Sequence, residues 1–261
     1  MKSIAFTLVL LQATDALRVP MNNLDRRNAL KVGAGAAVAS SFPFAAFAAD
    51  KPKVVVFGGS GYVGAYAAQM LVGKGASVVS VSRKSPSDAA AKVKEILGTS
   101  LTGVEYTQLD AISGDLSGVL SGASAVISCV GIAPGGQNMK DGNGLANKKI
   151  ADAAKAAGVG KFVYLGLASE LANGPIKFLF GDYVKGKGEA EAAVAKDYGD
   201  AALVIKPGII EGGPPGEVRP PGPPGMTPVA VVDVAKAAVA GALGEKVGTV
   251  DGNAAITAAA K

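Results

Sequence analysis

Three spaced glycines directly after an apolar run form the part of this chain best suited to hold a phosphate. In such a loop the first glycine permits a tight turn, the second lets the backbone approach a pyrophosphate, and the third lets a helix pack against a sheet. The start of that helix would present free N–H groups to the phosphate oxygens. The loop residues to which we assign ligand binding are Gly58, Ser60, Gly61, Tyr62, Val63 and Gly64. Their spacing predicts a dinucleotide site, and the alternative is a tight turn that binds nothing.

The end of the next apolar run decides which dinucleotide is expected. An NAD-specific site carries an acidic residue there to bind the ribose hydroxyls, whereas this chain has Ser82 and Arg83. A guanidinium binds a 2′-phosphate through two charge-assisted hydrogen bonds, so we expect NADP(H) rather than NAD(H). The alternative is a solvated basic pair at the start of a loop. Asp110 is expected to contact the adenine, and Val130 and Gly131 to face the cofactor.

The residue types that the chain lacks exclude several chemistries. Without histidine there is no Ser-His-Asp triad, no Cys-His pair and no histidine-ligated metal, and we expect no metal site. The single cysteine, Cys129, excludes an intrachain disulfide and a thiolate cluster. It lies in an apolar run, where we expect a small buried core residue rather than a reactive thiol. Acid–base chemistry must therefore use Tyr, Lys, Asp, Glu or Ser.

The elements that would position these residues alternate along the chain. We predict strands at 53–57, 77–82, 103–107, 124–130, 161–165 and 201–206, and helices at 61–73, 88–97, 144–157, 184–197 and 229–243. Such alternation predicts an α/β fold, a doubly wound and mostly parallel Rossmann sheet with helices on both faces. The Pro/Gly-rich stretch 212–225 can form neither helix nor central strand, so we expect a surface excursion there. It would be a small C-terminal lid over the substrate or a plain linker.

Residues 1–49 are interpreted as a cleaved targeting leader, which leaves 50–261 as the folded domain. A charged start and a short apolar run at 4–11 fit a signal peptide. Arg26 and Arg27, followed by an alanine-rich stretch, are similar to a twin-arginine export signal. Two signals in series resemble the tandem leaders of algae with secondary plastids, so we expect a plastid location and, for the second signal, the thylakoid lumen. A transit peptide to the plastid stroma and a mitochondrial leader are the alternatives.

The charge and hydropathy of the chain limit which classes of binding partner we expect. The formal net charge is +5. The leader holds five basic and two acidic residues, which leaves about +2 for residues 50–261 without a long basic run. We therefore expect no nucleic-acid partner. No transmembrane helix is expected in that part, while peripheral membrane association and the oligomeric state stay open.

From Lys53 to about Leu243 the chain resembles the atypical short-chain dehydrogenase/reductases, an NAD(P)-binding Rossmann group that includes NAD-dependent epimerase-like and NmrA-like proteins. Within them it looks closest to the branch of the NAD(P)H-binding accessory subunit of respiratory complex I and of plastid and mitochondrial relatives linked to quinone metabolism. The matching segments are residues 54–83, 124–131, 143–166, 181–194, 203–213 and 228–241.

The resemblance implies a catalytic pair. The family's tyrosine and lysine, spaced YxxxK, match Tyr183 and Lys187. Residues four apart share one helix face, so the ammonium could lower the pKa of the phenol and also hold the nicotinamide ribose. Tyr183 would then exchange the proton while the nicotinamide moves the hydride. The alternative is an exposed helix in which Tyr183 packs and Lys187 is solvated. Pro207 matches the segment that flanks the nicotinamide, with Lys206 where arginine is usual.

One departure from the family's pattern weakens the interpretation of the chain as an enzyme. Family enzymes carry a serine shortly after the fifth strand that polarises the substrate carbonyl, but Gly166 and Leu167 occupy those positions and Ser169 is displaced. The resemblance thus implies an NADP(H)-dependent oxidoreductase with an atypical active site, acting on a small apolar or quinone-like substrate. The missing serine favours the alternative, a non-catalytic NADP(H)-binding structural or regulatory subunit of a membrane redox complex. A membrane-associated plastid scaffold is the third reading.

Overall fold

The structure, a computed structural model, describes residues 51–213 and 225–261, which belong to one compact unit, Ala49–Lys261. The leader predicted for residues 1–49 and most of the predicted Pro/Gly-rich excursion lie outside the described residues. Within the described ranges, no helix is both long and apolar enough to cross a bilayer.

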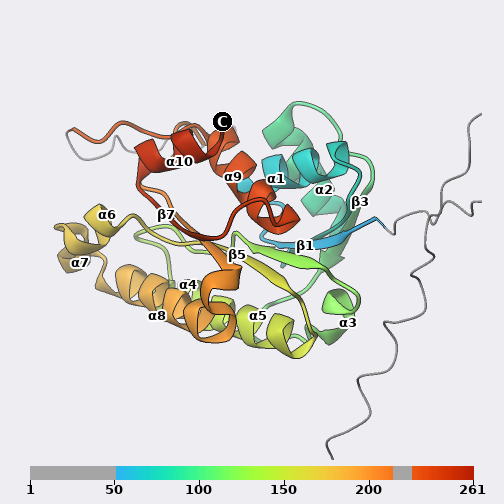
Figure 1. Cartoon of the computed structure of the whole chain (residues 1–261), viewed down its shortest axis with the longest axis horizontal. Helices are drawn as coiled ribbons and strands as arrows, with labels where there is room; N and C mark the ends of the chain where they lie inside the picture. The colour runs from blue at the N-terminus through green and yellow to red at the C-terminus, as the bar shows by residue number, and fades with distance from the viewer. Residues whose placement is uncertain (1–50, 214–224) are drawn as a thin grey trace, which may run out of the picture. The chain divides into compact units, whose positions relative to one another are not determined.

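A single parallel sheet runs through the described part of the chain, with the strand order β3-β2-β1-β4-β5-β6-β7 (Figure 1). The strands are β1 (Lys53–Phe57), β2 (Ser77–Ser82), β3 (Val104–Gln108), β4 (Ala125–Ser128), β5 (Lys161–Leu165), β6 (Ala202–Lys206) and β7 (Gly248–Asp251). The predicted α/β Rossmann fold is confirmed, and the sheet is parallel throughout. All six predicted strands are present, and β7 is an addition.

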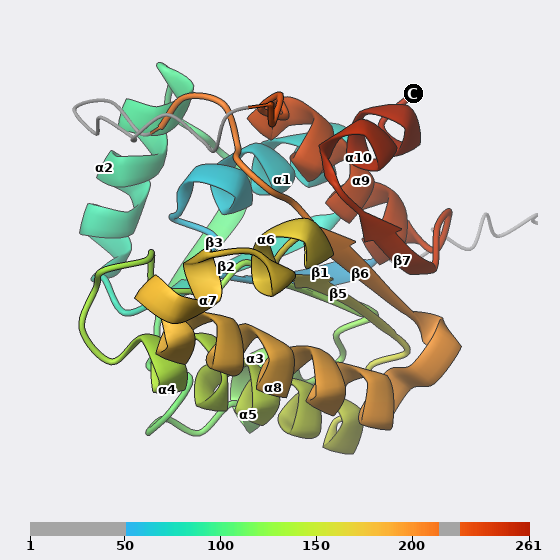
Figure 2. The ribbon, with the colours of Figure 1, turned by 90° about the vertical axis from the view of Figure 1, so that its left-hand side faces the viewer.

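Helices cover both faces of the sheet. They are α1 (Tyr62–Gly73), α2 (Pro86–Leu97), α3 (Ser117–Leu120), α4 (Met139–Asn143), α5 (Leu145–Ala156), α6 (Ser169–Asn173), α7 (Ile176–Leu179), α8 (Gly181–Tyr198), α9 (Val231–Leu243) and α10 (Asn253–Ala259). Figures 1 and 2 show α1, α9 and α10 on one face and α3, α5 and α8 on the other. Each predicted helix is present, with ends that differ slightly from those predicted.

The core consists of two apolar layers, one on each side of the sheet. Val54 and Val56 of β1 pack in the layer under α1 and α9. Val55 and Phe57, the alternate residues, pack in the layer under α5 and α8. Because both faces of the central strands are covered, these strands are continuous apolar runs rather than alternating ones.

The elements that sequence reasoning missed or misplaced are short or begin at capping residues. Helix α2 begins at Pro86, two residues earlier than predicted, because Ser85 accepts a hydrogen bond from the Asp88 N–H (3.2 Å) and proline suits the first helical position. Strand β7 has no residue that is fully buried, so it gives no apolar run to detect. Helices α3, α4, α6 and α7 have only four or five residues each.

Candidate functional site

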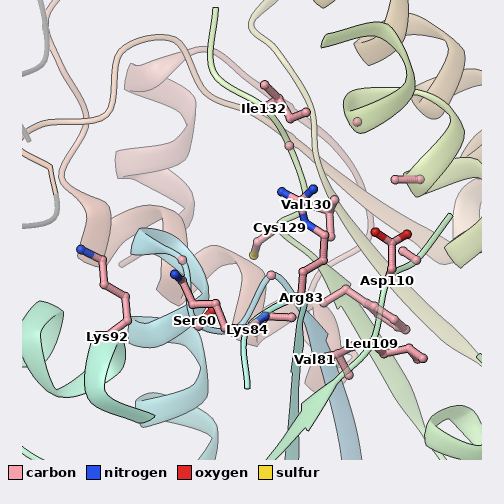
Figure 3. Close-up of a pocket in the computed structure, with 18 of the residues that line it drawn as sticks. Ser60, Val81, Arg83, Lys84, Lys92, Leu109, Asp110, Cys129, Val130 and Ile132 are labelled. Atoms are coloured by element: carbon pink, nitrogen blue, oxygen red, sulfur yellow. Dashed lines mark hydrogen bonds between the residues drawn. The ribbon is translucent and has the colours of Figure 1, made fainter. Parts of the chain in front are cut away.

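A cavity of about 800 Å³ opens at the carboxyl ends of β1, β2 and β4 (Figure 3). Here the strand order reverses, since β1 pairs with β2 on one side and with β4 on the other. Ligands of open α/β sheets bind at such switch points. The predicted site residues that line the cavity are Gly58, Ser60, Gly61, Tyr62, Ser82, Arg83, Asp110, Val130 and Gly131. The tertiary structure thus brings together most of the predicted cofactor site.

The glycine loop is packed so tightly that two of its glycines cannot be replaced without movement. Gly58 has a φ of +75°, and its N–H donates to the Val81 carbonyl at 2.8 Å. A Cβ atom on Gly58 would lie 3.0 Å from the carbonyl carbon and oxygen of Cys129. A Cβ atom on Gly64 would collide with the Gly58 carbonyl oxygen. The loop is therefore fixed against β2, β4 and the first turn of α1.

The backbone donors of this loop fit a pyrophosphate. The Ser60 N–H has no hydrogen-bond partner within the described residues, and the Ser60 side chain is buried. The Val63 N–H, in the first turn of α1, has no acceptor inside the helix. Gly61 lines the cavity without a side chain in the way. Together these groups form a cradle for an anion at a helix N-terminus.

Arg83 supplies a positive charge beside the cradle. Its side chain extends from the end of β2 toward Val130 (Figure 3), and Gln108 Nε2 holds its carbonyl at 3.1 Å. Among residues 51–213 and 225–261, no hydrogen bond or ion pair engages the guanidinium. The pKa of Asp110 is lowered, chiefly by the Ile112 N–H and to a smaller extent by the charge of Arg83. Asp110 thus remains a carboxylate next to the guanidinium.

Two further lysines line the cavity, and sequence reasoning missed both. Lys84 follows Arg83, and Lys92 comes from α2. Lys92 pairs with Glu95 at 3.1 Å, one turn along the same helix. Lys84 forms a basic pair with Arg83 in the sequence, and this was a signal for it, but nothing in the sequence indicated that α2 would turn Lys92 toward the cavity.

Two buried asparagines fix the cavity wall that follows β4. The Asn147 Nδ2 group donates to the Val130 carbonyl at 3.1 Å, while Asn147 Oδ1 accepts from the Ser128 hydroxyl at 2.5 Å. The Asn143 Nδ2 group donates to the Ile132 carbonyl at 2.9 Å. Both asparagines are fully buried. Asn147 lies four residues after Asn143 and shares the buried face of α5 with Ile150, Ala151 and Ala154, and this placement was the signal that could have identified the pair.

Lys187 lies directly behind the cavity wall. Its ammonium donates to the Leu165 carbonyl at 2.8 Å, and only 9% of the residue is exposed. A Cβ atom on Gly131 would be 3.4 Å from Lys187 Nζ. Burial lowers the pKa of Lys187 to about 8. Lys187 is therefore buried, whereas the alternative to a catalytic pair was an exposed helix with a solvated Lys187.

Tyr183 lies one turn before Lys187 on α8, as the spacing predicts. Burial raises the pKa of Tyr183, which is opposite to the lowering expected from a neighbouring ammonium. Within the described residues the Tyr183 hydroxyl has no hydrogen-bond partner. Tyr183, Lys187, Pro207, Val63 and Gly64 do not line the described cavity.

The displaced serine is engaged elsewhere. The Ser169 N–H donates to Asp251 Oδ1 at 3.0 Å, and the Ser169 hydroxyl also bonds to this carboxylate. Lys206 Nζ lies 3.0 Å from Glu191 and 3.8 Å from the same Asp251. The Pro207 carbonyl accepts from the Ala168 N–H at 3.0 Å. Ser169 is thus tied to the edge strand β7.

Cys129 borders the cavity and is only partly exposed. Burial raises the pKa of its thiol to about 12, against a smaller opposite effect of Lys187. A thiol with that pKa is protonated and unreactive at neutral pH. In the described part of the chain, no group of three or more His, Cys, Asp or Glu side chains could hold a metal ion.

Comparisons with known proteins agree with this geometry. A family model described as NAD(P)H-binding matches residues 58–244. An uncharacterized chloroplastic protein of Arabidopsis thaliana is 36% identical over 162 residues, which are 61% of this chain and 51% of that protein. The chain therefore spans about half the length of this curated relative.

Solved structures with low sequence identity share the fold. UDP-glucuronic acid 4-epimerase of Bacillus cereus, in complex with UDP-glucuronic acid and NAD, superposes with a TM-score of 0.60 at 17% identity, covering 77% of each chain. An oxidoreductase of Lactococcus lactis gives a TM-score of 0.52 at 19% identity, covering 71% of this chain and 82% of the other. At these identities the likeness shows the fold alone.

Proposed function

Since this chain belongs to the NAD(P)H-binding family, whose model matches residues 58–244, we propose that it is an NADP(H)-dependent oxidoreductase. Its substrate would be a small apolar or quinone-like carbonyl compound. The observation that carries the proposal is the buried ammonium of Lys187, which lies behind Gly131 at the wall of the cofactor cavity. The substrate class is supported by the resemblance of the sequence to quinone-linked relatives.

The chemistry assigns one task to each residue of the pair. When bound, the nicotinamide supplies the hydride for the carbonyl carbon. Tyr183 gives its proton to the carbonyl oxygen, and the raised pKa of the phenol keeps that proton in place until charge develops on the oxygen. Lys187 holds the nicotinamide ribose through its ammonium. The phenolate of Tyr183 then regains a proton from water.

The preference for NADP(H) rests on Arg83. Its guanidinium lies in the cavity without a hydrogen-bond partner among the described residues, and Ser82 beside it also lines the cavity. A 2′-phosphate would accept two parallel hydrogen bonds from that guanidinium. A ribose hydroxyl would gain little from it, because the acidic acceptor of NAD-specific sites is missing after β2.

The cofactor is tested by fluorescence titration of residues 50–261 with NADPH and NADH. Arg83→Ala should lower the affinity for NADPH about 10-fold to 100-fold, as expected for hydrogen bonds to a charged group. The affinity for NADH should stay nearly unchanged. Lys94→Ala, on the exposed side of α2, is the matched control for losing one positive charge. Equal losses for both nucleotides would contradict the assignment of Arg83 to the 2′-phosphate.

Catalysis is tested by screening NADPH oxidation with quinones and short-chain carbonyl compounds. Tyr183→Phe should lower kcat about 100-fold or more, since general acid catalysis contributes about 10²-fold to 10⁴-fold. Tyr106→Phe is the matched control, because the Tyr106 hydroxyl is buried without a partner in the described structure and lies outside the cavity lining. Unchanged activity in Tyr183→Phe would contradict the assignment of Tyr183 as the general acid.

A second candidate is a non-catalytic NADP(H)-binding subunit of a membrane redox complex. It is favoured by the loss of the usual serine and by the engagement of Ser169 with Asp251. A bound nucleotide stabilises a fold even without turnover. NADPH that raises the Tm, combined with no oxidation by any quinone or carbonyl compound, would favour this candidate.

We further propose a plastid location, with the thylakoid lumen as the destination of the second signal. The chloroplastic name of the Arabidopsis relative supports the plastid part. N-terminal sequencing of the mature protein tests it. A start near Asp50 would support cleavage of both signals, whereas a start near Leu17 would argue against the second one.

A further inference from the structure

The hydrogen-bond ladder between β4 and β5 stops before that between β5 and β6. Ser128 and Tyr164 are the last paired residues of β4 and β5. On the other side of β5, the ladder with β6 continues past the strand end. The Gly166 N–H donates to the Ile205 carbonyl at 2.8 Å, and the Ala168 N–H donates to the Pro207 carbonyl at 3.0 Å. The strands β4 and β5 therefore part at their carboxyl ends.

The register shows which backbone groups lose their partners there. In a parallel sheet, alternate residues of a strand bond to the same neighbour. Because Gly166 and Ala168 bond to β6, Leu165 and Leu167 face β4. By the same rule, Val130 faces β5, since its neighbour in sequence donates to β1.

A continued ladder would join the Val130 N–H to the Leu165 carbonyl and the Leu167 N–H to the Val130 carbonyl. Side chains have taken both acceptors instead. Lys187 Nζ donates to the Leu165 carbonyl at 2.8 Å, and Asn147 Nδ2 donates to the Val130 carbonyl at 3.1 Å. The two N–H groups, of Val130 and Leu167, have no partner within the described residues.

Unpaired N–H groups at this depth call for an explanation. Leu167 is only 6% exposed, and Val130 is partly buried where it lines the cavity. Buried N–H groups without partners are rare because they lose free energy relative to water. Here the carbonyls of the opened ladder are satisfied while the donors are left, so the gap offers donors only. Such a gap suits an oxygen atom that carries negative charge.

We propose that the N–H groups of Val130 and Leu167 form an oxyanion-binding pair that replaces the serine missing after β5. This proposal deepens the proposed function and rests on it. The two donors lie on neighbouring strand ends, close after the last paired residues Ser128 and Tyr164. One oxygen that accepts two N–H groups at about 2.9 Å each can bridge donors up to about 6 Å apart. The ammonium of Lys187, bound to Leu165 O in the same gap, adds positive charge.

The pair acts on a substrate with a reducible carbonyl group. Bound NADPH would supply the hydride for the carbonyl carbon and would leave as NADP⁺, so that the C=O π electrons end on the oxygen. The two N–H groups stabilise the negative charge on that oxygen without giving up their protons. Tyr183 supplies the proton that completes the alcohol. The backbone thus performs the polarising role that a serine hydroxyl performs elsewhere in the family.

The first test follows the two amide signals by NMR in ¹⁵N-labelled protein of residues 50–261. Benzoate is the probe, since its carboxylate carries the charge of an alkoxide and can bind beside NADP⁺. We expect the amide protons of Val130 and Leu167 to move downfield, saturably, when benzoate is added to the NADP⁺ complex. A titration that leaves both signals unchanged overturns the proposal.

The outcome is separable from failure of the proposed function. NADP⁺ binding is measured first, by its own chemical-shift changes in the glycine loop around Gly61. If NADP⁺ does not bind, the proposed function fails and this inference fails with it. If NADP⁺ binds and benzoate does not move the two amide signals, only this inference fails.

The second test removes one donor. Leu167→Pro and Leu167→Ala both lose the leucine side chain, but only proline lacks the N–H. We expect kcat with the best quinone or carbonyl substrate to be at least about 10-fold lower in Leu167→Pro than in Leu167→Ala, with equal NADPH affinity. Equal kcat values in two folded variants would overturn the proposal. Should Leu167→Pro not fold, the benzoate titration of the unaltered protein decides.

Discussion

The glycine loop between β1 and α1 and the open ends of β4 and β5 both leave backbone N–H groups without partners among residues 51–213 and 225–261, but by different means. In the glycine loop the donors belong to one short segment, Gly58–Gly64, whose own turn directs them. Between β4 and β5 the donors come from strands more than thirty residues apart, and side chains of α5 and α8 take the matching carbonyls.

The contrast shows how local and long-range structure can produce the same kind of site. A binding loop formed by one segment loses its ligand affinity when the residues of that segment change. A site made by an interrupted ladder depends on residues that never touch the ligand, such as Asn147. The following variants test this difference between the two regions.

The largest effect is expected from Gly64→Val, which disrupts the local site. A Cβ atom there meets the Gly58 carbonyl oxygen and lies 2.8 Å from the Gly59 Cα atom. We expect the free energy of unfolding to fall by about 3 kcal/mol and NADPH affinity to fall at least about 100-fold. Urea unfolding and NADPH titration measure both. Gly73→Ala, where a Cβ atom meets nothing within 4 Å, should change stability by less than about 1 kcal/mol.

Lys187→Met tests the buried charge of the open-ladder site. Burial lowers the pKa of Lys187 from 10.5 to about 8, so between these values the unfolded chain binds more protons than the folded one. The free energy of unfolding of the unaltered protein should therefore rise with pH, relative to Lys187→Met, by up to about 3 kcal/mol between pH 8 and pH 10.5. Below pH 8 the difference should be constant.

Urea unfolding of the cofactor-free proteins at several pH values measures this difference. Lys185→Met, on the exposed side of α8, is the matched control for losing a lysine. A difference between Lys187→Met and the unaltered protein that stays flat from pH 8 to pH 10.5 would show that Lys187 is not a desolvated ammonium.

Asn147→Leu tests the remote support of the same site. The substitution leaves the Val130 and Asn143 carbonyls and the Ser128 hydroxyl without their partner. We expect a loss of about 2 kcal/mol in the free energy of unfolding. Activity should fall further than NADPH affinity, because the freed Val130 carbonyl can accept the Leu167 N–H and close the gap. Lys148→Leu, an exposed neighbour, serves as the control, and equal effects of the two variants would argue against a supporting role.

The smallest effect is expected from Tyr62→Phe, in the glycine loop. The Tyr62 hydroxyl donates to the Glu211 carbonyl at 3.2 Å, a long-range contact at an exposed position. Its loss should cost about 0.5–1 kcal/mol and raise the Kd for NADPH by about 2-fold to 5-fold. Tyr66→Phe controls for the neighbouring ring, which meets Tyr62 edge to face. A loss as large as that of Gly64→Val would mean that the glycine loop also depends on distant segments.

The strand ends show where sequence reasoning reached its limit. An apolar run predicted a strand over 124–130, yet the ladder between β4 and β5 ends at Ser128. The next residues, Cys129 and Val130, are apolar because they pack against the two core layers. Hydrophobicity cannot reveal where a neighbouring strand parts from its partner, because that depends on which groups compete for the backbone carbonyls.

The Rossmann fold, six of the strands and the glycine loop could be predicted from the sequence, because each depends on local spacing and apolar periodicity. The sequence also placed Arg83 at the end of β2. The pairing of donors and acceptors across long separations could not be predicted from the sequence: Asn147 with Val130, 17 residues apart, Lys187 with Leu165, 22 apart, and Ser169 with Asp251, 82 apart. Backbone groups bind the nearest partner in space, and that partner is set by how β4, β5 and α8 pack.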